Sequence, residues 1–579
     1  MWNDTQQSGT NRVIEADISI DGRYYMCDFE TLTHIPTRVW AYAFCDVSLD
    51  PRMLTRGTNL DGWLAYLHSL PTQSIVYFHN LRFDGTFIIP YLFEQGYKWV
   101  EHEHNPREMP RNSFSTLISD MGQWYEVVIK LSNYHVIKIR DSFKLLRMPV
   151  AAMAKAFNLP MHKGDLNYNL YRSKTHALTD EEISYIDRDV KIVAISLAHL
   201  FKQGLTNMTI GSCAMKMFKT TCDFKELYPE LAPGIDRYCR NSYRGGWCFV
   251  NPIWRGKEIR VPGFVLDENS AYPWAMRENE LPYGEPIYYE GEAVLLDTLY
   301  IQRITCSFEL KRGHFPFIQL RNNAYFQPNQ YPKTCSNVVE LTLTSIDLEM
   351  FLENYDVYNL TYIDGYYFNS NKGVFNTYID TYMKMKIDNN DNKPLRTIAK
   401  LMLNNLGGKF ATSSAQYEYV PVLTEDNKIV YALTPCEPGK TVYVPVAAFM
   451  TAYARRRIVK TAELFGDRFC YSDTDSVHVI GDGIPSAVEV DSLKLGYWDR
   501  EFDFKEACYH AQKTYIEIGA DEVSLKACGL PGRNAEEIKA HMDVEDLKTL
   551  KVEGVLKTRK TRHGTILRNT TFEIKERVW

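Results

Sequence analysis

The sequence lacks the patterns that would place it in several large classes of protein. None of its twelve cysteines forms a CxxC pair or a Cys/His zinc spacing. No apolar run approaches the roughly 18 residues that a membrane-spanning helix needs. The first twenty residues are polar and without the apolar core of a signal peptide. We therefore expect reduced thiols, no contact with a membrane, and an intracellular protein that is not secreted.

A positive net charge is also missing. The formal charge is −6, whereas a protein that binds nucleic acid needs Lys and Arg to neutralise phosphates. The distribution tells more than the sum, because residues 551–579 contain eight Lys or Arg and three Glu. The net charge therefore decides nothing, and the basic C-terminal segment is compatible with phosphate contacts.

The chain is long and rich in aromatic residues. Its 579 residues exceed what one hydrophobic core accommodates, so two or more domains are expected. Aromatic residues make up 13% of the chain and include 38 tyrosines. This excess argues against disorder and suits stacking on bases as well as core packing.

Strand and helix patterns divide the chain into regions. YYMCDFET and SIVYFHN predict strands, and TDEEISYIDRDVKIVAISLAHLFKQG predicts a helix capped by Thr179, so an α/β domain ends near Gly204. Residues 280–375, rich in Tyr, Asn and Pro, predict an irregular inserted subdomain. A helix is predicted from Pro394 to Gly407–Gly408, and a β-hairpin over 415–440. The exposed face of that helix is predicted to carry Lys393, Arg396, Lys400 and Asn404.

Two acidic segments flank this cationic helix in the sequence. GFVLDENSAYP places Asp267 at the end of an apolar strand, and RFCYSDTDSVHVI places Asp473 and Asp475 at a tight turn between strands. Each acidic segment alone is typical of an ordinary turn, in which Asp and Ser are favoured. A row of Lys and Arg on a helix is usually a face exposed to solvent. Together they favour a site where two Mg²⁺ ions and the cationic helix bind a triphosphate.

A second acidic set lies towards the N-terminus. Asp28 and Glu30 share one face of a strand, Asp84 follows the second strand, and Tyr185 and Asp189 share a helical face. Taken one at a time, each of these acidic residues is more typical of an exposed position on the surface of a strand or helix. Four carboxylates from three elements can hold two divalent metals about 4 Å apart and hydrolyse a phosphodiester.

Motifs in the C-terminal half resemble those of family B DNA polymerases. DENSAYP, KLMLNNLGG and YSDTDS resemble DxxSLYP, KxxxNSxYG and YxDTDS, in the same order. The resemblance implies that Asp267 and Asp475 bind metal, with Asp473 as the accompanying catalytic carboxylate. It implies nucleotide contacts for Tyr272, Lys400, Lys386 and Asn404. The ring of Tyr272 would lie under the sugar of the incoming nucleotide. Lys513-Thr514-Tyr515 resembles the KxY motif that holds the primer end.

The N-terminal motifs resemble those of DEDDy proofreading 3′–5′ exonucleases, namely DxE, Nx₂–₃FD and Yx₃D. The implied catalytic set is Asp28, Glu30, Asp84, Tyr185, Asp189 and Lys163. Four of these, Asp28, Glu30, Asp84 and Asp189, would bind metal, and Tyr185 would orient the attacking water. Asn80 and Phe83 resemble residues that grip the primer end.

Nearly the whole chain after residue 20 is similar to the protein-primed branch of family B, used by small bacteriophages with linear genomes. Its length is below that of ordinary family B replicases. Tyr243-Arg244-Gly245-Gly246 matches the YxGG segment that couples the two sites on DNA, and the segment with Ser142 resembles (S/T)Lx₂h, with Phe143 where Leu is usual. Motif B departs at Gly407, where the family has tyrosine.

The resemblance implies an α/β and α+β multidomain fold, with an RNase H-like exonuclease domain followed by a right-hand polymerase of palm, fingers and thumb with two insertions. The implied limits are 1–20 (extension), 21–208 (exonuclease), 209–278 and 444–529 (palm), 279–375 (insertion contacting the priming protein), 376–411 (fingers), 412–443 (hairpin insertion for processivity and strand displacement) and 530–579 (thumb).

Cofactors and partners follow from the same resemblance. Two Mg²⁺ or Mn²⁺ ions are expected at each site. The expected partners are template and primer DNA, dNTPs, a terminal (priming) protein and a single-stranded-DNA-binding protein, around a monomeric enzyme in the cytoplasm of an infected bacterium. Two alternatives stay open: a nucleic-acid-primed family B polymerase of a mobile element or repair system, and a non-catalytic DNA-binding replication factor.

Overall fold

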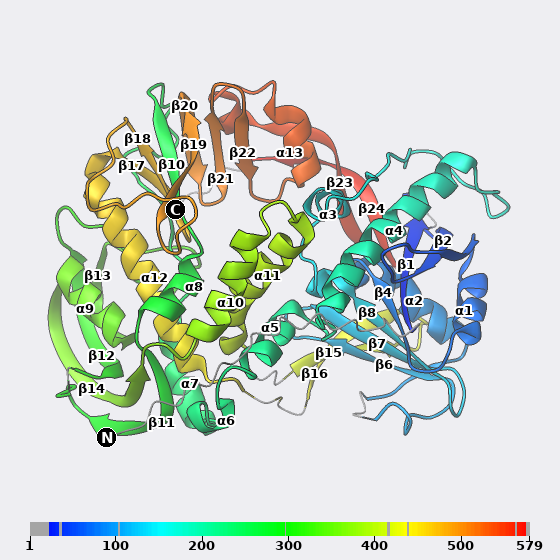
Figure 1. Cartoon of the computed structure of the whole chain (residues 1–579), viewed down its shortest axis with the longest axis horizontal. Helices are drawn as coiled ribbons and strands as arrows, with labels where there is room; N and C mark the ends of the chain where they lie inside the picture. Colours follow the sequence, from blue (N-terminus) through cyan, green and yellow to red (C-terminus); the bar gives the residue numbers. More distant parts are fainter. Residues whose placement is uncertain are drawn as a thin grey trace, which may run out of the picture.

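The computed structural model describes residues 23–574 except 34–36, 102–104, 296, 414–416, 437–438, 440 and 562–563. The extension predicted over residues 1–20 lies outside these residues. Figure 1 shows an eight-stranded sheet on one side of the molecule, two further sheets on the other, and helices α10 and α11 between them. All twelve cysteines are free thiols. Among the described residues, no helix has the length and apolar character needed to cross a membrane.

The N-terminal region is a mixed sheet in the order β3-β2-β1-β4-β8-β7-β6-β5, with β1, β4 and β8 parallel. Its strands are β1 Tyr24–Thr31, β2 Val39–Asp46, β3 Met53–Gly57, β4 Ser74–Phe78, β5 Lys98–Trp99, β6 Ser113–Ile118, β7 Trp124–Lys130 and β8 Val136–Asp141. Its helices are α1 Leu60–Ser69, α2 Leu81–Glu94, η1 Ser142–Lys144, α3 Val150–Ala156 and α4 Asp180–Lys202. The predicted strands β1 and β4 are confirmed, as is the helix α4 with its Thr179 cap, which forms a complete capping box with Glu182.

A second sheet has the antiparallel order β19-β10-β18-β17-β9. Its strands are β9 Cys248–Val250, β10 Gly263–Glu268, β17 Phe469–Asp473, β18 Ser476–Ile480 and β19 Trp498–Phe504. The helices around it are α5 Ile210–Phe218, α6 Phe224–Leu227, α7 Pro233–Ser242, α8 Ala271–Glu278, α10 Asn376–Asp388, α11 Lys393–Phe410, α12 Val444–Phe465 and η2 Gly466–Arg468. Helix α12 contacts β17 and β18 and is buried along most of its length, so it packs against this sheet and supports it.

Most of the region from 281 to 371 is regular, although 311–333 contain no helix or strand, so the prediction of an irregular subdomain is wrong. It contains β11 Leu281–Glu290, β12 Leu299–Leu310, β13 Thr334–Thr344, α9 Ser345–Asn354 and β14 Tyr355–Asn371, in the sheet order β11-β14-β12-β13. The tyrosines that broke the expected periodicity are good strand formers and pair across the sheet. Tyr289 and Tyr367, for example, have ring centroids 4.1 Å apart.

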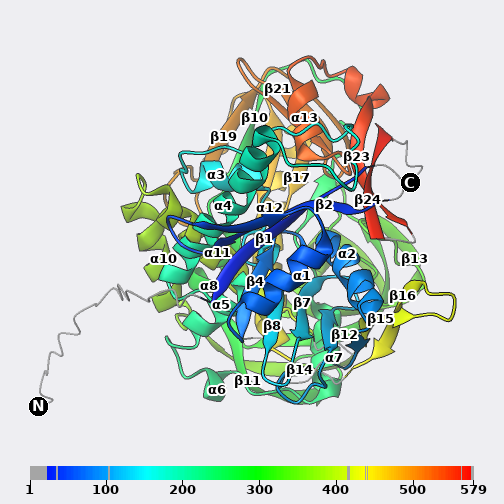
Figure 2. The ribbon, with the colours of Figure 1, turned by 90° about the vertical axis from the view of Figure 1, so that its right-hand side faces the viewer.

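The predicted end of the helix at Gly407–Gly408 is also wrong, because α11 continues to Phe410. A Cβ at Gly407 would lie 2.4 Å from the Sδ atom of Met450 in α12. The glycine therefore serves close packing of α11 on α12 and does not terminate the helix. The predicted hairpin is confirmed as β15 Tyr417–Leu423 and β16 Ile429–Pro435, visible in yellow in Figure 2.

The C-terminal part joins the second sheet to the N-terminal region. It comprises β20 Glu506–Ala511, β21 Thr514–Ile518, β22 Val523–Ala527, α13 Gly532–Lys539, η3 Asp546–Thr549, β23 Lys551–Thr561 and β24 Gly564–Glu573. Strand β24 contacts α2, so segments from opposite ends of the described chain lie side by side (Figure 2). The β15–β16 hairpin contacts β6. Strand β24 and this hairpin therefore both pack against the N-terminal region.

Arg455 of α12 and Asp347 of α9 form an ion pair that is almost completely buried. Arg455 of α12 donates to both carboxylate oxygens of Asp347 at 2.8 and 2.7 Å, and the two side chains are 1% and 0% exposed. Removing one partner of such a pair leaves an uncompensated buried charge, which costs more than the pair itself contributes.

We expect Asp347→Ala to lower the free energy of unfolding by about 3–5 kcal/mol, because Arg455 would stay buried without a counter-charge. Glu349→Ala is the matched control, since Glu349 pairs with Arg456 at the exposed surface and should cost less than about 1 kcal/mol. Thermal and denaturant unfolding measure both variants. Equal losses would contradict the importance of the buried pair.

Candidate functional site: two carboxylate centres

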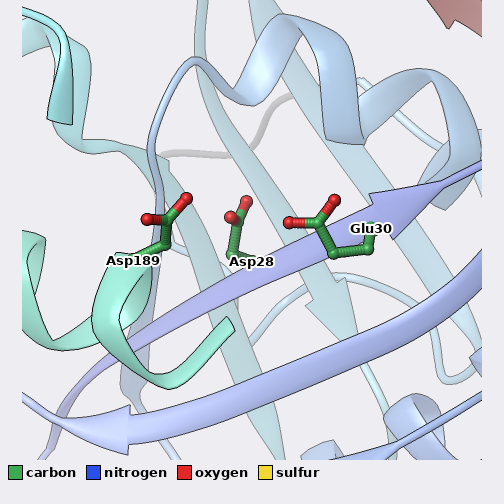
Figure 3. Close-up of side chains that lie close together, drawn as sticks. All are labelled: Asp28, Glu30 and Asp189. Atoms are coloured by element: carbon green, nitrogen blue, oxygen red, sulfur yellow. The ribbon is translucent and has the colours of Figure 1, made fainter. Parts of the chain in front are cut away.

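The first centre lies where β1 meets α4. Asp28 and Glu30 project from β1 and Asp189 from α4, and one carboxylate oxygen of each lies within 4.8 Å of the others (Figure 3). Asp84, in the first turn of α2, is 2% exposed and has an Oδ1 without a hydrogen-bond partner among the described residues; the same holds for Oδ1 of Asp189. Buried carboxylate oxygens without partners fit the ligand set of a divalent metal.

Burial and mutual repulsion oppose ionisation at this centre. The pKa of Asp28 is raised to about 7, chiefly by burial and then by the charge of Asp189, with Lys163 acting in the opposite direction. The pKa values of Glu30 and Asp84 are also raised, first by burial and then by the charge of Asp28. A divalent cation would offset both effects, so the residues present suit a metal centre.

Two groups beside the carboxylates can act on a water molecule. Lys163 Nζ donates to Asp189 Oδ2 at 2.5 Å, and Tyr185 lies one helical turn before Asp189 on α4. The hydroxyl of Tyr185 is 2.9 Å from that of Tyr168. Sequence reasoning missed Tyr168, which has no distinguishing neighbour in the chain beyond its closeness to Lys163.

The residues expected to hold a primer end line the start of α2. Asn80 has a φ of +71° at the helix N-terminus, with its N–H donating to Asp141 Oδ1 at 2.9 Å. Phe83 is partly buried against Phe87. Ser142 is instead fully buried, with its hydroxyl bonded to the Phe78 carbonyl, so its side chain supports this segment from inside.

The second centre lies at one edge of the β19-β10-β18-β17-β9 sheet. Asp267 is near the end of β10, and β17 and β18 are joined by a turn at Thr474, whose φ is +68°, with Asp473 and Asp475 on either side. Asp267 is opposite Ser476, the neighbour of Asp475, so the two acidic segments meet as predicted. Within the described residues they do not form a compact ligand set of three like that at Asp28.

The electrostatics of the second centre also favour a bound cation. The pKa of Asp267 is raised to about 8, chiefly by burial and then by the charges of Asp475, Glu501 and Asp499. Burial likewise raises the pKa of Asp475 to about 6. Sequence reasoning missed Asp499 and Glu501 on β19, although the alternation in WDREFDF indicated an acidic strand face.

Cationic side chains from α10 and α11 face this centre. Lys386 Nζ donates to Asn269 Oδ1 at 2.8 Å. The pKa of Lys386 is lowered to about 8, chiefly by burial and then by the charges of Lys400 and Arg396, so three cations converge. Lys400 and Asn404 are exposed on the same face of α11, as predicted. This arrangement can bind a polyanion beside the carboxylates.

Aromatic and glycine residues complete the surroundings. The pKa of Tyr272 is raised to about 12, chiefly by burial and to a smaller extent by Tyr243 and Asp475. Gly246 packs against Thr474, because a Cβ there would lie 2.7 Å from Thr474 Cγ2. Arg455 holds this segment by donating to the carbonyl of Gly245 at 2.8 Å.

The KTY segment forms the turn between β20 and β21 and meets the same centre. Lys513 Nζ lies 2.8 and 2.6 Å from the two carboxylate oxygens of Asp473, and Tyr515 packs against Tyr471. Asp473, Lys513 and Thr514 border a cavity of about 470 Å³ whose walls also include Gly245, Gly246 and Thr474. Asp473, the first two residues of KTY and the two glycines of YRGG therefore line one cavity.

The chain is similar to known DNA polymerases. The family described as "DNA polymerase type B, organellar and viral" matches residues 68–482. The DNA polymerase of Bacillus phage phi29 is 41% identical over 509 residues, which cover 86% of this chain and 86% of the relative. The chain belongs to this family of type B DNA polymerases. The polymerase of Streptococcus phage Cp-1 is 30% identical over 586 residues, covering 96% and 99% of the two chains.

The structure agrees with this membership in the type B polymerases. It superposes on phi29 DNA polymerase complexed with primer-template DNA and incoming nucleotide with a TM-score of 0.85 and 37% identity, over 95% of this chain and 100% of that chain. The expected fold is thereby confirmed: an RNase H-like exonuclease domain and a right-hand polymerase with two insertions. The enzyme is a DNA-directed DNA polymerase of the protein-primed viral type, with a 3′–5′ exonuclease, and depends on divalent metal.

A partly buried histidine near the exonuclease centre predicts a dependence of stability on pH. His79 bonds to Ser142 Oγ and to the Met148 carbonyl, both at 3.0 Å. Burial lowers its pKa from 6.5 to about 4. The folded protein therefore binds fewer protons than the unfolded chain between these values, and stability falls as pH drops from about 6.5 towards 4.

We expect the wild type to lose about 2 kcal/mol more than His79→Gln between pH 7 and pH 5. Denaturant unfolding of both proteins at the two pH values measures the difference. The variant controls for the carboxylates, which titrate in both proteins. Identical losses would show that His79 titrates alike in the folded and unfolded states.

Proposed function

We propose that this enzyme replicates a linear viral genome from a protein primer, in the cytoplasm of an infected bacterium. It would act as a monomer, processively and with strand displacement, on template and primer DNA and dNTPs, with a terminal protein and a single-stranded-DNA-binding protein as partners. The observation that carries this proposal is the pair of separate carboxylate centres in a chain 41% identical to the phi29 polymerase. The phi29 polymerase structure with a TM-score of 0.85 is a complex with primer-template DNA and incoming nucleotide, which supports the same substrates here.

For DNA synthesis, we assign metal binding to Asp267 and Asp475, with Asp473 beside them. Two Mg²⁺ or Mn²⁺ ions would supply activation of the primer 3′-oxygen and charge stabilisation of the leaving pyrophosphate. Lys386, Lys400 and Asn404 would bind the triphosphate, and Tyr272 would lie under the sugar. Lys513 and Tyr515 would hold the primer end, and Lys513 also balances the charge of Asp473.

For proofreading, we assign metal binding to Asp28, Glu30, Asp84 and Asp189, which would hold two Mg²⁺ or Mn²⁺ ions. Tyr185 and Lys163 would orient the attacking water, because both adjoin Asp189. Asn80 and Phe83 would grip the primer end. Tyr243, Gly245, Gly246 and the segment around Ser142 would guide DNA between the centres.

The domain limits are proposed as follows: 21–208 exonuclease, 209–278 and 444–529 palm, 279–375 insertion contacting the priming protein, 376–411 fingers, 412–443 hairpin insertion and 530–579 thumb. In support, the eight-stranded sheet and α4 end before 209, and the β11-β14-β12-β13 sheet lies within 279–375. The β15–β16 hairpin has exposed apolar residues such as Leu423 and Leu433, which suit a contact with nucleic acid or protein.

Separating the two activities tests the assignment of the centres. Asp475→Ala should reduce Mg²⁺-dependent dNTP incorporation by several orders of magnitude and leave nuclease activity intact, because it removes a ligand from one centre only. Asp28→Ala with Glu30→Ala should do the converse. Primer extension and degradation of labelled single-stranded DNA measure the two activities. Normal synthesis by Asp475→Ala would refute the metal assignment.

Protein priming has a direct test. Incubation with the terminal protein of the same virus, dATP and Mg²⁺, without any primer, should yield a covalent protein–nucleotide adduct. Asp475→Ala should abolish the adduct, because the same centre would catalyse initiation. Extension of DNA primers without any adduct would support the nucleic-acid-primed alternative instead.

A further inference from the structure

A buried carboxylate that the proposed reaction does not use follows Asp267 directly. Glu268 is 1% exposed, and its side chain points to the opposite face of β10 because side chains alternate along a strand. Neither carboxylate oxygen accepts a hydrogen bond from any described residue. Its ion pair joins Oε1 to Nε of Arg457 in α12, at 3.3 Å.

Arg457 touches two further elements. Its guanidinium donates to the carbonyl of Gly496 and lies over the ring of Trp274 in α8, 4.0 Å from the centroid. Gly496 has a φ of +74°, and a Cβ there would lie 2.0 Å from Trp274 Cδ1. The loop around Gly496 is thus pressed onto Trp274 in a conformation that glycine adopts most readily.

The same loop holds Asn269, two residues after Asp267. The N–H of Gly496 donates to the Asn269 carbonyl at 2.9 Å, and the N–H of Asn269 donates to the Tyr497 carbonyl at 2.9 Å. The side-chain amide of Asn269 donates to the Ser492 carbonyl at 3.0 Å. Its Oδ1 is then left to accept from Lys386 Nζ at 2.8 Å.

A continuous series of contacts therefore runs from Arg457 through Gly496 and Asn269 to Lys386. A buried ion pair with such incomplete hydrogen bonding is a weak source of stability, since desolvation offsets much of its attraction. Its geometric effect is definite, because Arg457 connects α12, β10, α8 and the loop at one point. Each link is a hydrogen bond, ion pair or ring contact between described residues.

We propose that Arg457, paired with Glu268, is a positioning residue for nucleotide binding: it fixes the Ser492–Tyr497 loop and thereby orients Asn269 and Lys386. Among the described residues, no hydrogen bond or ion pair joins Arg457 to Asp267 or Asp475, so we infer that it acts through the loop. The inference rests on the proposed assignment of Lys386 to the triphosphate.

Arg457→Gln tests this role in the full-length enzyme. We expect KM for dNTP to rise roughly tenfold with little change in kcat, because Lys386 would be less well placed to bind the triphosphate. Exonuclease activity should be unchanged, which also reports correct folding. Arg456→Gln is the matched control, since this neighbouring arginine pairs with Glu349 at the surface. An unchanged KM in Arg457→Gln, or an equal rise in the control, would overturn the proposal.

A double-mutant comparison separates positioning from a general loss of structure. If Arg457 acts through Lys386, then Arg457→Gln should add no further rise in KM to that of Lys386→Gln. Multiplication of the two effects would refute the proposed route. Should Arg457→Gln not fold because Glu268 is left unpaired, Glu268→Gln with Arg457→Gln removes both charges, and the same comparison applies. Asp475→Ala decides the polymerase assignment independently, so failure of one proposal is distinguishable from failure of the other.

Discussion

Repulsion between carboxylates held in poorly solvated positions is the constraint on which both centres depend. Asp28, Glu30 and Asp189 at one centre, and Asp267 with Asp475 at the other, have raised pKa values chiefly because they are buried. Flexible loops would relax by separating such groups. Here the acids stand on a strand, within the long helix α4 or on a tight turn between strands, which keeps them together until metal cations offset the repulsion.

Cations from the protein are placed so that they relieve only part of this repulsion. Lys163 contacts Asp189, Lys513 contacts Asp473, and Lys386 bonds to Asn269 beside Asp267. Two arginines of helix α12 hold backbone segments beside the second centre. Arg455 holds the Gly245 carbonyl near the Thr474 turn, whereas Arg457 holds the Gly496 carbonyl near Asn269. One helix thus fixes the backbone on both flanks of the metal ligands.

The sequence alone predicted what local patterns encode. Asp28 and Glu30 alternate on a strand, and Asp473 and Asp475 flank a turn, so their placement follows from the chain within a few residues. Contacts between distant segments have no such local signature. The pairing of Glu268 with Arg457 and the registration of Asp499 beside Asp267 depend on how α12 and β19 pack. The β11-β14-β12-β13 sheet was missed because its tyrosines concealed the alternation of its long strands.

Gly407 illustrates why a motif has to be considered with its packing partners. According to the family pattern alone, Gly407 replaces the tyrosine of motif B. In the structure, Met450 of α12 occupies the position that a Cβ at 407 would take, and Met276 of α8 lies 3.9 Å from it. A tyrosine restored at 407 would therefore collide with Met450 unless that side chain moved or were also replaced. The departure in motif B is thus coupled to the fit between α11 and α12, and its effect on nucleotide selection belongs to both residues together.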